Sequence, residues 1–404
     1  MHRIKIATFT ATMALGVLTG LADRASAQGV TAYEGARVIV GDGRVLDNTT
    51  LVVSGTKITQ IGGTVPAGAT RVSLAGKTVM PMFLDTHTHL STTRDKLVAD
   101  LRQRAYFGVG AALSLGTDNY ELLDLRNKDN PGMARFFSAG KGISRTEGRP
   151  TLEINSVEEA RKAVRTNVGY NVDIIKVWVD DRDGKFDKVL PSQYEAIIDE
   201  AHKNGLRVTA HIFNEIDGKR LIRAGIDAFA HSVRDKDIDD EMLALYKSKP
   251  NLVVNPNLPD RGIKQDLSWL KPSLAPTDYA KLEEGNTDRP KAQEFYGIQS
   301  RNLAKINAAG VKIVLGTDGN RAWAPHEEAA DMVAAGMTPM QVIIAATKNA
   351  AEFLKMSDTG TLEAGKNADF IVLDANPLDD ITNTRKISQV ILRGAAVDRS
   401  KLPN

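Results

Sequence analysis

The run Asp173-Ile174-Ile175-Lys176-Val177-Trp178-Val179 is the stretch of the sequence that decides the fold. After Asp173 the run is apolar apart from Lys176, which is typical of a strand buried on both faces of a parallel sheet. A helical pattern follows at residues 192–204, and a second apolar run follows at residues 206–210. Strand, helix and strand in this order predict a β-α-β unit with two parallel strands.

The same alternation continues on either side of this unit. The other candidate strands are residues 82–85, 111–115, 135–138, 228–231, 252–255 and 311–315. About eight strand–helix repeats within residues 81–357 predict an α/β fold, the (β/α)8 TIM barrel, which typically needs about 250 residues. A doubly wound parallel sheet is the alternative, but no glycine-rich phosphate-binding turn follows any of these strands.

Both ends of the chain show a different pattern, in which short strands are separated by turns. Residues 37–40, 51–53 and 58–61 precede the barrel region, and residues 369–373 and 390–392 follow it. Dense strand–turn punctuation indicates a β module. We therefore expect a small β-sandwich domain built from residues 28–80 and 358–404.

The first 27 residues have the layout of a secretory signal peptide. They combine a basic start, an apolar stretch at residues 6–21 and the pattern Ala25-Ser26-Ala27. We expect cleavage after Ala27 and a mature chain that is periplasmic or secreted. No later segment approaches the roughly 20 apolar residues of a membrane span, so we expect no membrane contact after cleavage.

The charge balance also narrows the range of partners. Outside residues 1–27 the chain holds equal numbers of basic and acidic residues. A neutral chain has no long-range field that attracts nucleic acid or anionic lipid. We therefore expect a small-molecule substrate and no nucleic acid.

Four of the seven histidines fall at the C-terminal ends of predicted strands, the rim where barrel enzymes hold their active sites. His87 and His89 are two residues apart, so their side chains share one face of a strand and can bind one metal ion. His211 and His231 end two further strands. His202 lies in a helical pattern and is predicted to be on the surface.

Lys176 is unusual because it interrupts a strand that should be buried. A buried, unpaired ammonium group costs several kcal/mol unless it loses its proton or finds a partner. One interpretation is a lysine that reaches outward at the strand end. The other is a desolvated, nucleophilic amine within a metal site. Trp178 shares the face of Lys176 and is predicted to line the substrate cavity.

Two Gly-Thr-Asp tripeptides compete for the role of site carboxylate. Asp118 is followed three residues later by Glu121, the spacing of a helix capping box, and is therefore predicted to be a cap. Asp318 follows the last predicted strand and has no such partner. We assign Asp318 to the site.

These residues together resemble the dinuclear-metal pattern of the amidohydrolase superfamily, in its prolidase-like and imidazolonepropionase-related branch. The resemblance covers nearly the whole mature chain and includes residues 81–86, 335–339, 346–351 and 365–369. It implies a barrel with a domain formed by both chain ends, and a homo-oligomer.

The resemblance also implies roles for the six residues. His87, His89 and Asp318 would hold the more buried of two divalent metal ions, and His211 and His231 the more exposed one. Lys176 would be carboxylated by carbon dioxide and bridge both ions. Because the chain has no Cys, nitrogen and oxygen ligands favour zinc, with manganese or cobalt as alternatives.

Two segments depart from the family pattern. Residues 144–150 lack the Gly-Gly-His of many relatives, and residues 232–235, Ser-Val-Arg-Asp, replace a common Gly after His231. Both are predicted to lie near the pocket, so a relative's substrate does not transfer to this chain.

The expected reaction is hydrolysis of an amide-type C–N bond, in a dipeptide, N-acyl amino acid, carbamate or aryl urea. A water bridging two metal ions loses its proton readily, and Asp318 would act as general base and then as acid. Alternatives are a lactone or phosphotriester hydrolase on the same site, and a mononuclear deaminase. Such deaminases use a His-x-x-Glu glutamate, whereas Glu215 lies one residue too far from His211. A binding protein with a decayed site is disfavoured because all six positions hold competent ligands.

Substrate contacts are the least determined part of the site. Residues 257–290 form a long polar stretch that could act as a lid. Loop arginines could bind a carboxylate, aromatic side chains could form a wall, and His326 could be structural or face the substrate. The candidate substrate contacts are Trp178, Arg149, Arg182, Arg321, Trp323 and His326.

Overall fold

The computed structural model describes residues 29–128, 130–145 and 151–403. The predicted signal peptide at residues 1–27 lies outside the described residues. Within the described ranges, none of the helices combines the length and the apolar character needed to cross a bilayer.

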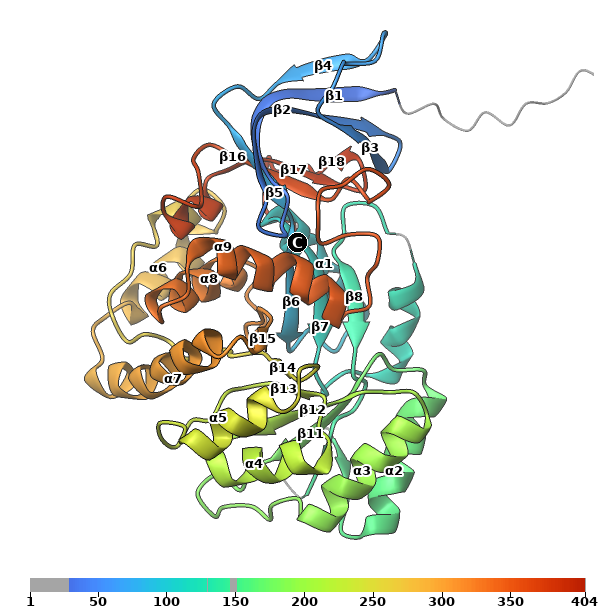
Figure 1. The fold of residues 1–404 in the computed structure, drawn as a ribbon, viewed down its shortest axis with the longest axis vertical. Coiled ribbons are helices and arrows are strands. Elements are labelled where there is room, and N and C mark those ends of the chain that lie inside the picture. Colours follow the sequence, from blue (N-terminus) through green and yellow to red (C-terminus); the bar gives the residue numbers. More distant parts are fainter. Residues whose placement is uncertain (1–28, 129, 146–150, 404) are drawn as a thin grey trace, which may run out of the picture.

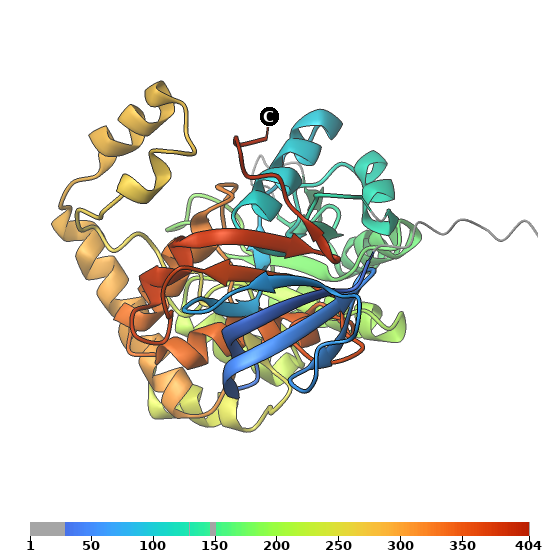
Figure 2. The same ribbon diagram turned by 90° about the horizontal axis from the view of Figure 1, so that it is seen from above.

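Strands from both chain ends form one sheet above the rest of the molecule (Figures 1 and 2). β5 and β16 pair antiparallel, with Pro81 opposite Phe370, and so join the two ends of the chain. The strands from the N-terminal part are β1 (Thr31–Ile39), β2 (Val45–Ser54), β3 (Lys57–Ile61), β4 (Thr70–Ser73) and β5 (Thr78–Pro81). Those from the C-terminal part are β16 (Phe370–Leu373), β17 (Ile387–Leu392) and β18 (Ala395–Ala396).

The sequence predicts a sandwich of two sheets here, whereas the hydrogen bonds join all eight strands in one sheet. The long strand β1 is the reason. Residues 31–34 pair with β4 and residues 37–38 pair with β5, so one edge of β1 carries two strands. The sheet has its own apolar core, which includes Val38, Leu51 and Phe370.

The middle of the chain forms two parallel sheets, and all eight strands predicted for the barrel are present, with ends that differ from the predicted ones by at most three residues. The three-stranded sheet has the order β6 (Phe83–Thr88), β7 (Val109–Ser114), β8 (Arg135–Ser138). The other sheet has the order β10 (Leu152–Glu153), β9 (Ile143–Ser144), β11 (Ile175–Val179), β12 (Val208–Ile212), β13 (Ala228–Phe229), β14 (Val253–Val254), β15 (Lys312–Ile313).

A few hydrogen bonds, but no continuous ladder, link these two sheets at both edges. The Thr86 amide donates to the Leu315 carbonyl at 2.9 Å, and Thr88 forms an isolated parallel bridge with Gly319. On the other side, the Asp173 amide donates to the Ser138 carbonyl at 2.9 Å. The described strands are therefore arranged toward a ring, but their ladders do not close into one continuous barrel, because no ladder joins β15 to β6 or β8 to the larger sheet.

Helices lie on the outside of these parallel strands (Figure 1). Sequence signals start some of them: Ser156 and Glu159 form a capping box before α2, and Thr338 and Gln341 form another before α9. The helices are α1 (Arg94–Tyr106), α2 (Val157–Gly169), α3 (Pro191–Lys203), α4 (Glu215–Ala224), α5 (Asp240–Lys247), α6 (Pro276–Gly285), α7 (Pro290–Ala308), α8 (Ala324–Ala334), α9 (Pro339–Ile344) and α10 (Ala350–Phe353).

The Trp178 ring fills the interior between neighbouring strand ends. A Cβ atom at Gly142 would lie 2.0 Å from Trp178 Cζ3, so only glycine fits there. We expect Gly142→Ala to lower the free energy of unfolding by about 1–3 kcal/mol, the usual cost of overpacking a core. Urea denaturation would measure the loss. Gly169→Ala is the control, because a Cβ atom at Gly169 meets nothing within 4 Å; equal stability of the two variants would contradict the prediction.

Candidate metal centre

The end of β6 and the loop after β15 bring three of the predicted ligands together. The backbone carbonyl of His87 accepts hydrogen bonds from the amides of Thr317 and Asp318, at 2.9 and 2.8 Å. The His89 amide donates to the Gly319 carbonyl at 3.2 Å. Asp318 has a positive φ of 54°, an uncommon backbone conformation for a residue other than glycine. These contacts hold the carboxylate against the two histidines.

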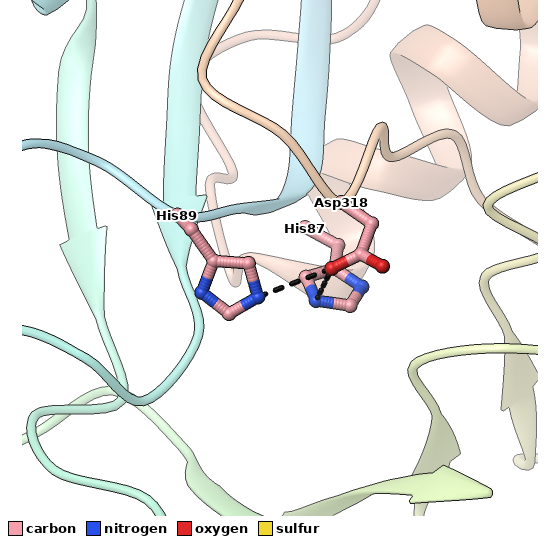
Figure 3. Close-up of side chains that lie close together, drawn as sticks. All are labelled: His87, His89 and Asp318. Carbon is pink, nitrogen blue, oxygen red and sulfur yellow. Dashed lines mark ion pairs between the residues drawn. The ribbon is translucent and has the colours of Figure 1, made fainter. Parts of the chain in front are cut away.

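Both histidines approach the same carboxylate oxygen (Figure 3). His87 Nε2 lies 3.2 Å and His89 Nε2 3.1 Å from Asp318 Oδ1. The ligand atoms of these three residues lie close enough together to hold one metal ion. Burial raises the pKa of the Asp318 carboxyl, but its interactions with His231 and His87 lower it by more, so the pKa lies well below its ordinary value.

The hydrogen bonds of His87 show that its donor set fits a cation. Nδ1 lies 2.9 Å from the Ala230 carbonyl and 2.7 Å from Asn257 Oδ1, so it carries the hydrogen and donates. Burial, reinforced by the charge of Lys176, lowers the pKa of His87 to about 4, so the ring is neutral. Its buried Nε2 therefore presents a lone pair, without a hydrogen-bond partner, to a carboxylate oxygen. A cation between the two satisfies both atoms.

Asn257 is a functional residue that the sequence analysis missed, because it lies in a loop far along the chain. We expect Asn257→Ala to weaken metal binding roughly 10- to 100-fold, the usual effect of removing a partner that orients a ligand. Competition with a chelator would measure the dissociation constant. Asn204→Ala, on an exposed helix end, is the control; an unchanged affinity in Asn257→Ala would contradict the prediction.

His211 is oriented in the same manner by Asp180. His211 Nε2 donates to Asp180 Oδ2 at 3.1 Å, and Asp180 Oδ1 accepts from the Arg182 amide at 2.9 Å. Burial lowers the pKa of His211 to about 4, so its Nδ1 is left as the neutral ligand atom. The sequence analysis also missed Asp180, although a carboxylate directly after the run 173–179 was a signal for it.

His231 lies beside these groups but has a different partner. Its ring centroid is 5.0 Å from that of His87 and 4.6 Å from that of His211. Arg234 Nη2 donates to His231 Nδ1 at 2.5 Å, which leaves the hydrogen on Nε2, 3.6 Å from Asp318 Oδ2. His231 therefore fits a metal ion through Nε2 only after its contact with Arg234 opens.

Lys176 points into the interior, as one of the two interpretations of the sequence expects. Its side chain is fully buried, and Nζ lies 5.2 Å from the centroid of the Trp178 ring. Its charge contributes to the lowered pKa of both His87 and His211. The outward-reaching alternative is wrong.

Two predicted roles need correction. Asp118 is not a helix cap: Asn119, not Asp118, occupies the N-cap position of the following 3-10 helix, and the buried Asp118 accepts from Ser114 Oγ at 2.6 Å and Ser138 Oγ at 2.5 Å. Hydroxyls on the neighbouring strands β7 and β8 bind this carboxylate instead. His326 does not contact substrate, because it is fully buried, accepts from Thr384 Oγ1 at 3.1 Å and donates to the Phe107 carbonyl at 2.7 Å.

The remaining candidate contacts divide into two groups. Trp178 is only 2% exposed, and Trp323 packs against Phe107 with ring centroids 5.8 Å apart, so the structure gives both packing roles. Arg182 lies over the Phe186 ring at 5.9 Å. Arg321 lines a cavity of about 290 Å³, together with Thr317 and the predicted lid segment. Arg149 lies outside the described residues.

The fold, this site and the similarities that follow define a metal-dependent amidohydrolase. The chain belongs to the amidohydrolase family, whose sequence pattern matches residues 78–397, and to its branch that is related to prolidases and imidazolonepropionases. It is 27% identical to an ochratoxinase of Aspergillus niger over 87% of this chain and 82% of that protein. It is 24% identical to an imidazolonepropionase of Deinococcus radiodurans, over 88% and 94% of the two chains. A Bifidobacterium longum protein provisionally described as a prolidase has a similar structure, with a TM-score of 0.76 and 28% identity over 94% and 96% of the chains.

Proposed function

We propose that this enzyme hydrolyses an amide-type C–N bond of a small molecule, from the dipeptide, N-acyl amino acid, carbamate or aryl urea classes. The observation that carries the proposal is the convergence of His87 Nε2 and His89 Nε2 on Asp318 Oδ1. Two histidine nitrogens and a carboxylate are a ligand set that zinc prefers.

The residues of the chain divide the work of the reaction. A zinc ion held by His87, His89 and Asp318 would supply an activated water and polarise the substrate carbonyl. Asp318 is ionised and is the general base: it accepts the proton of the attacking water and returns it to the leaving nitrogen. Asn257 keeps the hydrogen of His87 on Nδ1, so that Nε2 remains a ligand.

A second metal ion is part of this proposal. His211 presents Nδ1 to it, and Lys176, once carboxylated, would bridge both ions. Carboxylation turns a buried cation into an anionic ligand, which removes the cost of burying the ammonium group. His231 joins this site when Arg234 leaves its Nδ1.

We also propose the arrangement in which this site operates. The parallel strands close into a (β/α)8 barrel, with the domain formed by both chain ends beside it. The enzyme is exported after cleavage at Ala27, and it assembles as a homo-oligomer.

A hydrolysis screen tests the proposed reaction. Zinc-loaded enzyme would be mixed with dipeptides, N-acyl amino acids, aryl carbamates, aryl ureas, lactones and phosphotriesters, and the released amine quantified. We expect turnover of at least one C–N substrate class. Turnover of lactones or phosphotriesters alone, or release of ammonia from an aminated ring, would overturn the proposal in favour of the corresponding alternative.

Removal of the metal gives a separate prediction. Dialysis against a chelator is expected to reduce turnover to background, because the attacking water is activated by the metal ion. Added zinc is expected to restore the turnover. Activity and zinc content, measured on the same samples, would check this. Full activity in metal-free enzyme would contradict the proposal.

A further inference from the structure

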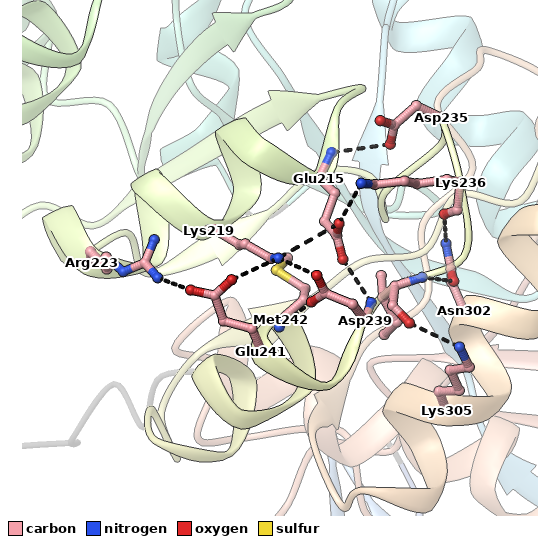
Figure 4. A network of polar contacts seen from close by, with 11 residues as sticks. Glu215, Lys219, Arg223, Asp235, Lys236, Asp239, Glu241, Met242, Asn302 and Lys305 are labelled. Atoms are coloured by element: carbon pink, nitrogen blue, oxygen red, sulfur yellow. Dashed lines mark hydrogen bonds and ion pairs between the residues drawn. The ribbon is translucent and has the colours of Figure 1, made fainter.

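The loop that follows His231, residues 232–239, is held by a buried carboxylate on one side (Figure 4). Glu215, at the start of α4, is 1% exposed. Its Oε1 accepts from the Asp239 amide at 2.7 Å, and its Oε2 lies 3.0 Å from Lys236 Nζ. The Glu215 amide in turn donates to Asp235 Oδ1 at 3.0 Å. One side chain and its own amide thus fix three residues of the loop.

A buried amide holds the same loop from the other side. Asn302, on α7, is fully buried. Its Nδ2 donates to the carbonyls of Val233 and Lys236 at 3.0 and 2.9 Å, and its Oδ1 accepts from the Ile238 amide at 2.8 Å. Buried polar groups satisfied in this way rigidify the backbone they bind. The loop is therefore a fixed support.

This support holds Arg234 at the metal centre. Its amide donates to the Phe213 carbonyl at 2.8 Å, and its Nη2 reaches His231 Nδ1. No carboxylate of the described residues forms an ion pair with Arg234 within 4.0 Å, and its buried Nε has no hydrogen-bond partner. A guanidinium group has five hydrogens to donate, so most of its donors remain available.

We infer that Arg234 binds a carboxylate of the substrate and so selects substrates that are anionic beside the scissile bond. The planar guanidinium matches a carboxylate with two parallel hydrogen bonds, and a charged acceptor competes well against the neutral His231 Nδ1. The inference rests on the proposed C–N hydrolysis and narrows it to dipeptides and N-acyl amino acids. Carbamates and aryl ureas without a carboxylate would be poor substrates.

A substrate carboxylate would also free His231 for metal binding, which its hydrogen bond from Arg234 now prevents. That ring can offer Nε2 to a metal ion only when Arg234 no longer donates to Nδ1. When the Arg234 guanidinium leaves His231 Nδ1, it needs another acceptor, because an unpaired buried charge is costly. The carboxylate supplies that acceptor, so binding of the substrate and release of His231 favour each other.

A matched pair of compounds tests the inference. N-benzoylglycine and N-benzoylglycinamide have the same scissile amide bond and differ only in the carboxylate. For the wild-type enzyme we expect kcat/KM to favour N-benzoylglycine. We expect Arg234→Met to lower kcat/KM for this compound roughly 10- to 100-fold, mostly through KM, and to change the amide less than about 3-fold. Arg234→Lys should recover part of the loss, because it keeps the charge. Arg301→Met removes an exposed guanidinium that pairs with Asp237 of the same loop and is the matched control.

The outcomes separate this inference from the proposed function. If Arg234→Met lowers turnover of both compounds equally through kcat, Arg234 only positions His231 and the inference is wrong. If the wild-type enzyme prefers the amide, the inference falls while C–N hydrolysis stands. If no C–N substrate is cleaved, the proposed function falls, and calorimetric titration with N-benzoylglycine still tests Arg234: tighter binding to wild type than to Arg234→Met supports it, and equal or absent binding overturns it.

Discussion

Asp318→Asn is expected to lower kcat for C–N hydrolysis by roughly 100- to 10,000-fold, the range that a general acid–base group contributes. Asparagine keeps the shape of the side chain but cannot accept the proton of the attacking water. It also removes the negative charge that His87 Nε2 and His89 Nε2 approach at 3.2 and 3.1 Å, so zinc affinity should fall in parallel. Steady-state kinetics at saturating zinc, with the zinc content of the same sample, would separate these two effects.

The control for this variant is Asp398→Asn, which changes an exposed carboxylate near the C-terminus. Its kcat and zinc content should match those of the wild-type enzyme. Wild-type turnover in Asp318→Asn would show that the reaction does not depend on the carboxylate at which the two histidines converge, and the proposed mechanism would fall.

Lys176→Met should remove the second metal ion. Methionine fills a similar volume in β11 but offers no nitrogen that carbon dioxide can modify. The loss of zinc affinity at the second site should exceed roughly 10- to 100-fold. That is the effect of removing a residue that only hydrogen-bonds a ligand, whereas Lys176→Met removes a bridging ligand itself. Plasma mass spectrometry should find two ions for each wild-type chain and no more than one for the variant.

Two further measurements distinguish a ligand from a packing residue. The variant should be at least as stable as the wild type, because a buried ammonium group has been replaced by an apolar side chain. Zinc uptake by metal-free wild-type protein should rise with added bicarbonate, and uptake by Lys176→Met should not respond. Lys203→Met, whose side chain is 63% exposed, is the control. Two ions in Lys176→Met would rule out the bridging role.

The sequence predicted the order and type of the central strands well, because those signals are local. The run 173–179 is apolar except for Asp173 at its start and Lys176, and β11 is buried over its whole length. The spacing of His87 and His89 placed both on one face of β6, and their convergence with Asp318 followed from the shared rim of strand ends. Lys176 was recognised because a lysine in such a strand contradicts its surroundings.

The partners of the ligands could not be predicted in this way. Asn257 lies 170 residues from His87 along the chain, and Asp180 lies 31 residues from His211. No local pattern states which loop reaches which ring. Asp118 shows the opposite error: its local spacing to Glu121 suggested a cap, but Ser138, 20 residues away, competes for the same oxygen atoms.

By itself, then, the sequence determined the alternation of strands and helices, the residues at the strand ends and the family, because periodicity and residue type act over a few neighbouring positions. The tertiary structure alone decided that the strands of both chain ends form one continuous sheet and not a two-sheet sandwich, that His326 is satisfied within the core, and that Arg234 reaches His231 from a loop held by Glu215 and Asn302. These features depend on contacts between distant segments, which form only when burial brings the segments together and leaves each buried polar group to find a partner.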